Sequence, residues 1–297
     1  MGNSPIVIGG VGGSGTRVIA EILHAQGIYL GDDLNAASDN LWFTLLFKRA
    51  ELFPDDDNLD EMNQGCDLFL KVMMQAQNVG QDVGQDVGQD VGPFLTLQDH
   101  RFLNRLAAED RLQHPKEWLK QRVDSIQLKF SGQQSDSTGN DRWGWKEPNA
   151  HFFVPYLESR IPELRYIHVV RHGLDMAFSK NQNQLAFWGE RLLGRPVDVS
   201  DPSDSLSYWC RVHQRVARYA DDLQGRFLSI DFDSFCVEPE KQMPELQDFV
   251  GVPSGGANLQ DIAIKPPAST GRFRDHDLSV FRDEDLLFVQ EMGFSID

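Results

Sequence analysis

Apolar residues along the chain occur in two patterns, short continuous runs and longer stretches with helical spacing. The first run, residues 6–8, leads into a turn with five glycines among residues 9–15. Apolar positions at helical spacing follow over residues 18–23, and Gly27 then supplies a helix stop signal. A short apolar run, a glycine turn and an amphipathic helix together predict the unit that opens a parallel α/β sheet.

The same alternation continues in the second half of the chain. Apolar runs predict strands over residues 142–146, 165–170 and 226–230. Helical spacing predicts helices over residues 149–161, from residue 173 onward, over residues 205–223 and up to about residue 250. Strands that alternate with helices predict an α/β fold with a mainly parallel central sheet, helices on both faces, and ligands at the carboxyl ends of the strands.

Between residues 39 and 130 the pattern is helical throughout. Segments with helical spacing cover residues 41–52, 68–77, 97–112 and 115–130. We interpret residues 39–130 as a helical insertion in a single domain that spans residues 1–297, although this length also fits two domains of about 150 residues. Within the insertion, Val-Gly-Gln-Asp occurs three times, and the glycines predict a flexible acidic loop over residues 79–92.

Charge and cysteine content narrow the class of protein. The chain has 28 Lys and Arg against 45 Asp and Glu, a formal charge of −17, so we expect neither a nucleic acid nor a membrane partner. Its apolar runs are much shorter than the roughly 18 residues of a membrane helix, and no secretory signal is recognisable at its start. Three widely spaced cysteines without a Cys-x-x-Cys pair are typical of reduced thiols rather than a zinc site. We therefore expect a cytoplasmic protein.

Residues 10–16, Gly-Val-Gly-Gly-Ser-Gly-Thr, form a candidate phosphate loop. Glycines let backbone amides approach an anion, and the following helix directs its positive end towards it. A nucleoside triphosphatase loop reads Gly-x-x-x-x-Gly-Lys-Ser/Thr; Gly15 is in register with it, but Thr16 and Arg17 stand where Lys and Ser/Thr belong. The sequence therefore predicts a phosphate loop of another kind, with an ordinary strand-to-helix turn as the alternative.

Two further candidate groups follow predicted strands. Arg171 ends one strand and Ser179 lies eight residues on, in the next helix, so their guanidinium and hydroxyl could hold a second phosphate. Lys146 ends another strand. Because the carboxyl ends of parallel strands share one edge, Lys146 and Arg171 are expected to face the crevice that the glycine loop borders. Each of them alone would also fit a solvated strand terminus.

Together these motifs resemble the sulfotransferase family that uses 3′-phosphoadenosine 5′-phosphosulfate. The resemblance assigns the family's 5′-phosphosulfate loop to Gly12, Gly13, Ser14, Gly15, Thr16 and Arg17, its 3′-phosphate element to Arg171 and Ser179, and its Lys-x-Pro element to Lys146 and Pro148. Residues 230–235 and 249–252 resemble a strand-to-helix block of the family, and residues 269–274, with Arg272, resemble the loop that often closes over the nucleotide. The family usually has Lys or Arg directly before Ser-Gly-Thr, where this chain has Gly13.

The resemblance implies a P-loop-like three-layer fold and transfer of a sulfuryl group to a hydroxyl or amine of a small-molecule or peptide acceptor. The donor would leave as adenosine 3′,5′-bisphosphate, and no metal is expected. In this interpretation Lys146 and Arg17 neutralise the leaving phosphate. Some family members have an acidic base after the first helix, which points to Asp33, with Asp32 as the second choice.

Other readings of these residues remain open at the level of sequence. His172, beside Arg171, is a rival base, whereas His168 lies within an apolar strand and is interpreted as a core residue. A kinase with an altered loop is an alternative function, supported by the apolar residues 227–231 that end in Asp231. A catalytically silent nucleotide-binding module is another. The acceptor and the oligomeric state have no signal in the sequence.

Overall fold

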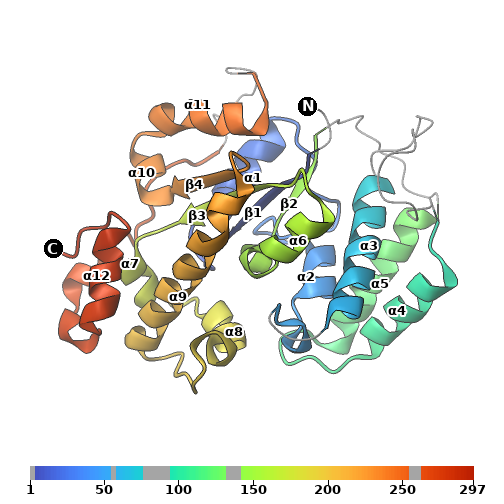
Figure 1. The fold of residues 1–297 in the computed structure, drawn as a ribbon, viewed down its shortest axis with the longest axis horizontal. Coiled ribbons are helices and arrows are strands. Elements are labelled where there is room, and N and C mark those ends of the chain that lie inside the picture. The colour runs from blue at the N-terminus through green and yellow to red at the C-terminus, as the bar shows by residue number, and fades with distance from the viewer. Residues whose placement is uncertain (1–3, 55–57, 76–93, 132–141, 254–261) are drawn as a thin grey trace. The chain divides into compact units, whose positions relative to one another are not determined.

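The structure, a computed structural model, describes residues 4–54, 58–75, 94–131, 142–253 and 262–297. The chain divides into two units, whose elements are labelled in Figure 1. We call Gly27–Glu147 with Met1–Ser4 the helical unit, and Pro5–Gln26 with Pro148–Asp297 the α/β unit. The expected helical insertion falls within the helical unit, and the repeat at residues 79–92 lies outside the described residues.

The α/β unit contains a parallel sheet, as the sequence predicts. Its strands β1 (Ile6–Gly10), β3 (Arg165–Val170) and β4 (Phe227–Asp231) lie in the order β1-β3-β4. In the register, Ile6 pairs with Arg165 and Tyr166 pairs with Phe227. All three strands are parallel, so their carboxyl ends meet at one edge, and the glycine loop and Arg171 both follow that edge.

Helices cover both faces of this sheet. Tyr166 and His168 share one face, and their rings lie 6.3 Å from Tyr219 and 5.1 Å from His213 of α9. Arg165 faces the other side, where its guanidinium lies over the ring of Phe249 in α11. This arrangement of helix, sheet and helix confirms the predicted three-layer α/β class. The helices and short 3₁₀ turns of this unit are α1 (Thr16–Ala25), η2 (Pro148–Phe152), α6 (Val154–Arg160), α7 (Gly173–Ala177), α8 (Asn183–Leu193), α9 (Pro202–Ala220), η3 (Asp221–Leu223), α10 (Phe232–Val237), α11 (Pro239–Val250), η4 (Arg272–Asp275), η5 (Leu278–Val280) and α12 (Asp283–Glu291).

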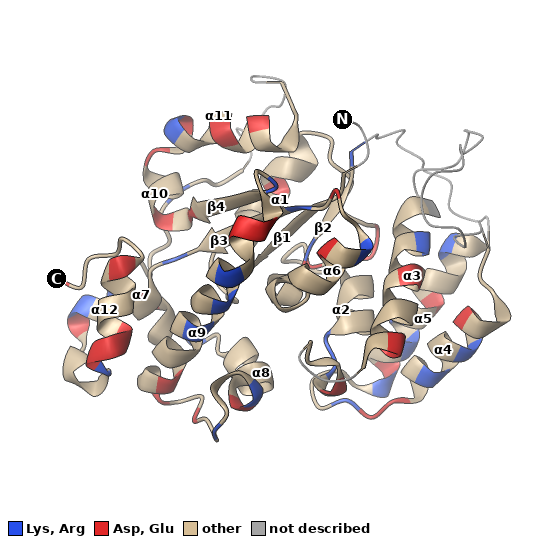
Figure 2. Cartoon of the chain, viewed as in Figure 1, with Lys and Arg blue, Asp and Glu red and all other residues tan. Residues whose placement is uncertain are grey.

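The helical unit packs its helices around an aromatic cluster. The rings of Phe43, Phe47, Phe69 and Trp145 stack or meet edge to face at centroid distances of 4.5–6.4 Å. Lys and Arg lie beside Asp and Glu along α3, α4 and α5 (Figure 2). The elements of this unit are α2 (Leu41–Phe47), η1 (Ala50–Leu52), α3 (Leu59–Gln75), α4 (Leu97–Ala108), α5 (Lys116–Phe130) and the short strand β2 (Gly144–Lys146).

Three helix boundaries in this unit differ from the sequence prediction, and one of them is the end of α4, at Ala108 instead of residue 112. The helix expected over residues 41–52 ends at Phe47, because Arg49 adopts an extended backbone and turns inward to pair with Glu51, Glu61 and Glu109. The helix expected from residue 68 begins at Leu59. Its first half buries Met62 and Cys66 rather than branched aliphatic residues, so the apolar pattern there is weak.

The three cysteines are free thiols and all are buried. Burial raises the pKa of Cys236 to about 11 and raises the pKa of Cys210 further. Among the described helices, none has both the length and the apolar character required to cross a membrane.

Candidate functional site

The glycine loop joins β1 to α1 in a conformation that needs glycine. Gly13 and Gly15 have φ of 97° and 98°, in the left-handed region. A Cβ on Gly15 would lie 2.4 Å from ring atoms of Phe232, so a side chain at this position would collide with α10. Gly15 is the N-cap of α1. The positive end of α1 has no side-chain cap and no acidic residue in its first turn, a geometry that suits an anion.

Ser14 adds a hydroxyl to this end of the loop. The residue is 1% exposed, and its Oγ has no hydrogen-bond partner among the described residues. Its backbone N–H donates to the carbonyl of Val11 at 3.0 Å, which fixes the turn. A buried hydroxyl without a partner is costly, and an oxygen of a bound anion would satisfy it.

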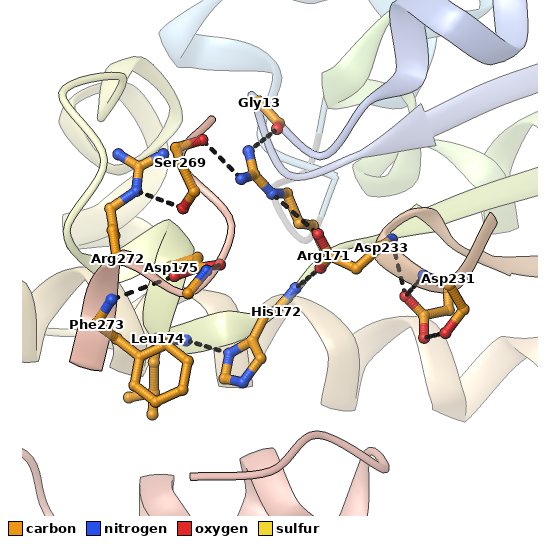
Figure 3. A network of polar contacts seen from close by, with 12 residues as sticks. Gly13, Arg171, His172, Leu174, Asp175, Asp231, Asp233, Ser269, Arg272 and Phe273 are labelled. Carbon is orange, nitrogen blue, oxygen red and sulfur yellow. Dashed lines mark hydrogen bonds and ion pairs between the residues drawn. The ribbon is translucent and has the colours of Figure 1, made fainter. Parts of the chain in front are cut away.

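Arg171 is held at the end of β3 against this loop. Its side chain is 7% exposed; Nη1 donates to the carbonyl of Gly13 at 3.4 Å and Nη2 donates to Ser269 Oγ at 2.7 Å (Figure 3). Its Nε lies 3.6 Å from Asp233 Oδ1. The structure thus brings Arg171 together with the glycine loop, as the sequence predicts, and with a segment that lies 98 residues further along the chain.

Arg272 brings a second guanidinium to the same region. Its Nε donates to the carbonyl of Ser269 at 3.1 Å and its Nη1 donates to the carbonyl of Phe178 at 3.3 Å. Burial lowers the pKa of Arg272, and the positive charge of Arg171 lowers it further. The carboxylate of Asp175 opposes both effects and raises the pKa of Arg272.

Ser179 follows Phe178 and lies at a cavity of about 440 Å³. Its Oγ accepts a hydrogen bond from the backbone N–H of Asn181 at 3.2 Å. The cavity lies within the α/β unit and is lined by Ala177, Phe178, Ser179, Lys180, Gln182, Asn183, Ala186, Val199, Ser200 and Pro202. A volume of this size is within the range of small-molecule sites.

Asp233 is a member of the site that the sequence analysis did not identify. Its Oδ2 accepts the backbone N–H of His172 at 2.9 Å, beside its contact with Arg171. Burial raises the pKa of Asp233, while the His172 N–H and the Arg171 charge oppose that effect. In the sequence, the one indication of Asp233 is that it lies within residues 230–235, which resemble a strand-to-helix block of the family.

His172, the rival base, and His168, which is expected in the core, have different environments. His172 Nδ1 accepts the backbone N–H of Leu174 at 3.2 Å, so Nε2 carries the proton and donates to the carbonyl of Ser295 at 2.7 Å. His168 is fully buried and hydrogen-bonds the Tyr166 hydroxyl at 2.8 Å through Nδ1. Burial lowers the pKa of His168 well below its usual value, in keeping with a core residue.

The residues predicted to act as bases lie in the helical unit. Asp33 Oδ2 accepts a hydrogen bond from Ser125 Oγ at 2.6 Å and pairs with Arg122 Nε at 2.8 Å. Trp42 Nε1 donates to the same Ser125 hydroxyl at 2.8 Å. Asp32, the second choice, is more exposed and pairs with the ammonium of Lys129. The role of Asp33 stays a prediction, and its geometry leaves Oδ1 outside these contacts.

The predicted catalytic cations also have partners. Lys146 is 2% exposed, pairs with Asp39, and donates to the carbonyl of Ala37 at 3.0 Å. Both partners lie in the helical unit. Arg17 lies on α1 in the α/β unit, where its 58% exposed side chain is 3.6 Å from Glu21. Their catalytic roles stay predictions.

A comparison with models of protein families identifies one family, and a comparison with solved structures identifies a similar fold. A sequence model described as "Sulfotransferase family" matches residues 5–255. No curated protein matches the chain. The fold is similar to the sulfotransferase domain from the Synechococcus PCC 7002 olefin synthase, with 15% identity, a TM-score of 0.51, and coverage of 99% of this chain and 97% of that one.

Two other solved structures are similar at lower scores. The sulfotransferase domain from the curacin biosynthetic pathway is 13% identical with a TM-score of 0.42, and the alignment covers 100% of this chain and 99% of that one. Sulfotransferase STF1 from Mycobacterium tuberculosis H37Rv is 14% identical with a TM-score of 0.39, over 92% and 77% of the two chains.

Proposed function

Because the chain belongs to the sulfotransferase family, we propose that it transfers a sulfuryl group from 3′-phosphoadenosine 5′-phosphosulfate to a hydroxyl or amine of a small-molecule or peptide acceptor. The observation that carries this proposal is the contact of the Arg171 guanidinium with the Gly13 carbonyl. Two elements that we propose to bind anions are far apart in sequence, and this contact makes them adjacent in the α/β unit. A doubly phosphorylated nucleotide needs two such elements.

The residues of this region fit the anionic groups of that donor. The uncapped start of α1 and the unpartnered hydroxyl of Ser14 suit the 5′-phosphosulfate. Arg171, Arg272 and Ser179 suit the 3′-phosphate, because Arg272 contacts the residue next to Ser179 and adds its charge to that of Arg171. The remaining loop residues assigned to the donor, Gly12 and Thr16, supply backbone amides.

Three side chains have catalytic roles in the proposed reaction. When bound, the donor supplies the sulfuryl group and a leaving phosphate. Lys146 and Arg17 provide positive charge for the developing negative charge on the leaving oxygen, a contribution that depends on positioning. Asp33 accepts the acceptor's proton at Oδ1, because Oδ2 already interacts with Ser125 and Arg122.

The proposal also covers the cellular location and the partners of the enzyme. We place it in the cytoplasm as a nucleotide-binding transferase without a nucleic acid or membrane partner. The formal charge of −17 supports the absence of a nucleic acid or membrane partner, because it opposes attraction to polyanionic surfaces. Adenosine 3′,5′-bisphosphate is then the nucleotide product.

Equilibrium binding of adenosine 3′,5′-bisphosphate tests the donor site directly. Wild-type protein should bind it saturably in a calorimeter, and Arg171→Ala should weaken binding by about a hundredfold, since two charge-assisted hydrogen bonds are lost. Arg226→Ala is the matched control, because Arg226 directly precedes β4 and pairs with Glu158. Absence of saturable binding, or equal affinity in the Arg171 variant, would contradict the proposal.

A transfer assay with radiolabelled donor and a panel of hydroxyl and amine acceptors separates the alternatives. Nucleotide binding without transfer to any acceptor would favour a catalytically silent module. Magnesium-dependent ATP hydrolysis would favour a kinase. For that alternative, the relevant carboxylate is already engaged, because Asp231 caps α10 through hydrogen bonds from Asp233 N and Ser234 N at 3.0 and 3.3 Å.

A further inference from the structure

The segment that carries Arg272 is attached to α7 and to the residues that flank it. We call residues 269–275 the arginine segment. Ser269 contacts Arg171, which precedes α7, and Arg272 contacts the carbonyl of Phe178, which follows it. The ring of Phe273 stacks on that of His172 at 4.5 Å. These contacts join residues almost a hundred positions apart in the chain.

Asp175 lies at the centre of this attachment. Its side chain belongs to α7 and the residue is 1% exposed. Oδ1 accepts the backbone N–H of Phe273 at 3.3 Å (Figure 3). Oδ2 accepts that of Gly271 at 2.7 Å. Both oxygens are therefore used as acceptors for amides of the arginine segment.

The arginine segment depends on Asp175 for the start of its 3₁₀ helix. Gly271 is the N-cap of η4, with φ of 77°, and no side chain of the segment caps this end. The carboxylate of Asp175 supplies the missing acceptor from another part of the chain, where negative charge also suits the helix start. Arg272 is the first residue of η4, so its direction follows from this anchor.

The Asp175 carboxylate accepts backbone amides of the arginine segment and, within the part of the chain that the structure describes, forms no ion pair with an arginine of the site. Among the described residues, Arg272 forms no ion pair and donates to carbonyl oxygens. The ion pair of Arg171 is with Asp233, at 3.6 Å. Asp175 therefore fixes the segment through amide hydrogen bonds, and its negative charge, which raises the pKa of Arg272, acts on that guanidinium without a direct ion pair.

We propose that Asp175 is a positioning residue of the donor site: it holds the arginine segment so that Arg272 and Arg171 face the same anion, while making no contact with the donor itself. The inference rests on the proposed function for the identity of that anion. The anchoring of Gly271 and Phe273 by the carboxylate stands independently of it.

Asp175→Asn tests the anchor with little change in volume. An amide has one oxygen, and its NH₂ group would face a backbone N–H, so one of the two hydrogen bonds is lost. Affinity for adenosine 3′,5′-bisphosphate should fall about tenfold. Amide hydrogen exchange at Gly271 and Phe273 should accelerate, while exchange in β3 stays slow.

Asp99→Asn is the matched control. Asp99 is a buried carboxylate that also accepts a backbone N–H, that of Thr96, but it lies in the helical unit. Its substitution should lower the free energy of unfolding and leave nucleotide affinity and exchange in the arginine segment unchanged. This separates a positioning role from general loss of stability.

A double-mutant cycle with Arg272→Ala decides whether Asp175 acts through Arg272. The second substitution should add little to the loss of affinity that the first produces, because both remove the same contribution. Additive losses, or unchanged exchange at Gly271 and Phe273 in Asp175→Asn, would overturn the positioning role. Wild-type protein that binds no nucleotide would contradict the proposed function instead, and exchange in the free protein would still report on the anchor.

Discussion

In the α/β unit, Arg171 and Arg272 donate to carbonyl and hydroxyl oxygens, and the acidic neighbour of Arg171, Asp233, lies 3.6 Å away. In the helical unit, Asp33 and Lys146 each lie against a side chain of opposite charge, Arg122 and Asp39 respectively. The contrast is therefore between single residues: among the described residues Arg272 has no ion pair, whereas Asp33 and Lys146 are each paired with an opposite charge.

Under the proposed function, this difference separates donor binding from catalysis. A donor anion can interact with Arg272 without displacing a carboxylate, whereas at Arg171 it competes with the ion pair to Asp233. Lys146 can act on a leaving phosphate only if that phosphate competes with Asp39, because an ion pair with so little exposure is costly to break. We therefore expect variants in the two units to have different signatures.

Asp33→Asn should produce the largest effect. Loss of a general base lowers turnover by about 10² to 10⁴, while nucleotide affinity should stay close to that of the wild type. Transfer rate with saturating donor and calorimetric affinity measure the two quantities. Asp32→Asn, which removes the partner of Lys129, is the control and should retain turnover. Full activity of Asp33→Asn would remove this residue from its assigned role.

Lys146→Met should destabilise the protein by about 3 kcal/mol, because Asp39 would lose its buried counter-ion. Urea unfolding measures this loss. Adding Asp39→Asn should restore much of the stability, because the uncompensated charge is then removed. Transfer should stay impaired in the double variant if Lys146 acts on the donor. Recovery of transfer together with stability would show that Lys146 has a structural role alone.

Acid should destabilise the α/β unit through its buried histidines. Burial lowers the pKa of His151 to about 3, that of His213 to about 4, and that of His168 well below its usual value. Unfolded histidines titrate near pH 6.5, so between about pH 6.5 and about pH 4 the unfolded chain binds protons that the folded unit does not. The free energy of unfolding should therefore fall with decreasing pH, by about 1.4 kcal/mol per pH unit for each histidine.

Urea unfolding at several pH values between about 4.5 and 7.5 measures this slope. His168→Gln should reduce it by the contribution of one histidine. His24→Gln is the control, because His24 lies exposed on α1 of the same unit. A slope that is the same in wild type and His168→Gln would contradict a neutral buried imidazole at this position.

Arg17→Ala should have the smallest effect on stability. Its ion pair with Glu21 is exposed on one helix, and such pairs contribute about 0.5 kcal/mol or less. Turnover should nevertheless fall if Arg17 replaces the basic residue that the family usually has at position 13. Unchanged turnover would mean that Lys146 alone neutralises the negative charge on the leaving phosphate.

The elements that the sequence predicts best are those with a strong local pattern. Residues 165–170 form β3 with the predicted ends, because an apolar run is bounded by charged residues on both sides. α12 was not anticipated; it buries Asp285 and Val289 among mostly charged or exposed positions, so its apolar pattern is weak. The break at Arg49 depends on three carboxylates elsewhere in the chain, which no local pattern contains.

The same distinction applies to the candidate site. The glycine loop can be predicted because its function depends on backbone geometry that consecutive residues encode. The anchoring of Gly271 by Asp175 joins residues 96 positions apart, and that of Asp33 by Ser125 joins residues 92 apart. Such pairs depend on the tertiary fold, and the sequence therefore indicates the candidate residues without showing which charges are already balanced.

The interior position of all three thiols has a practical consequence for spectroscopy. A maleimide dye reacts with thiolate, and buried groups such as Cys210 and Cys236 present very little of it near neutral pH. The native cysteines should therefore take up little dye, so an introduced cysteine can be labelled selectively. A fluorophore attached through Asp275→Cys, at an exposed position of the arginine segment, would report motion of that segment with minimal signal from elsewhere.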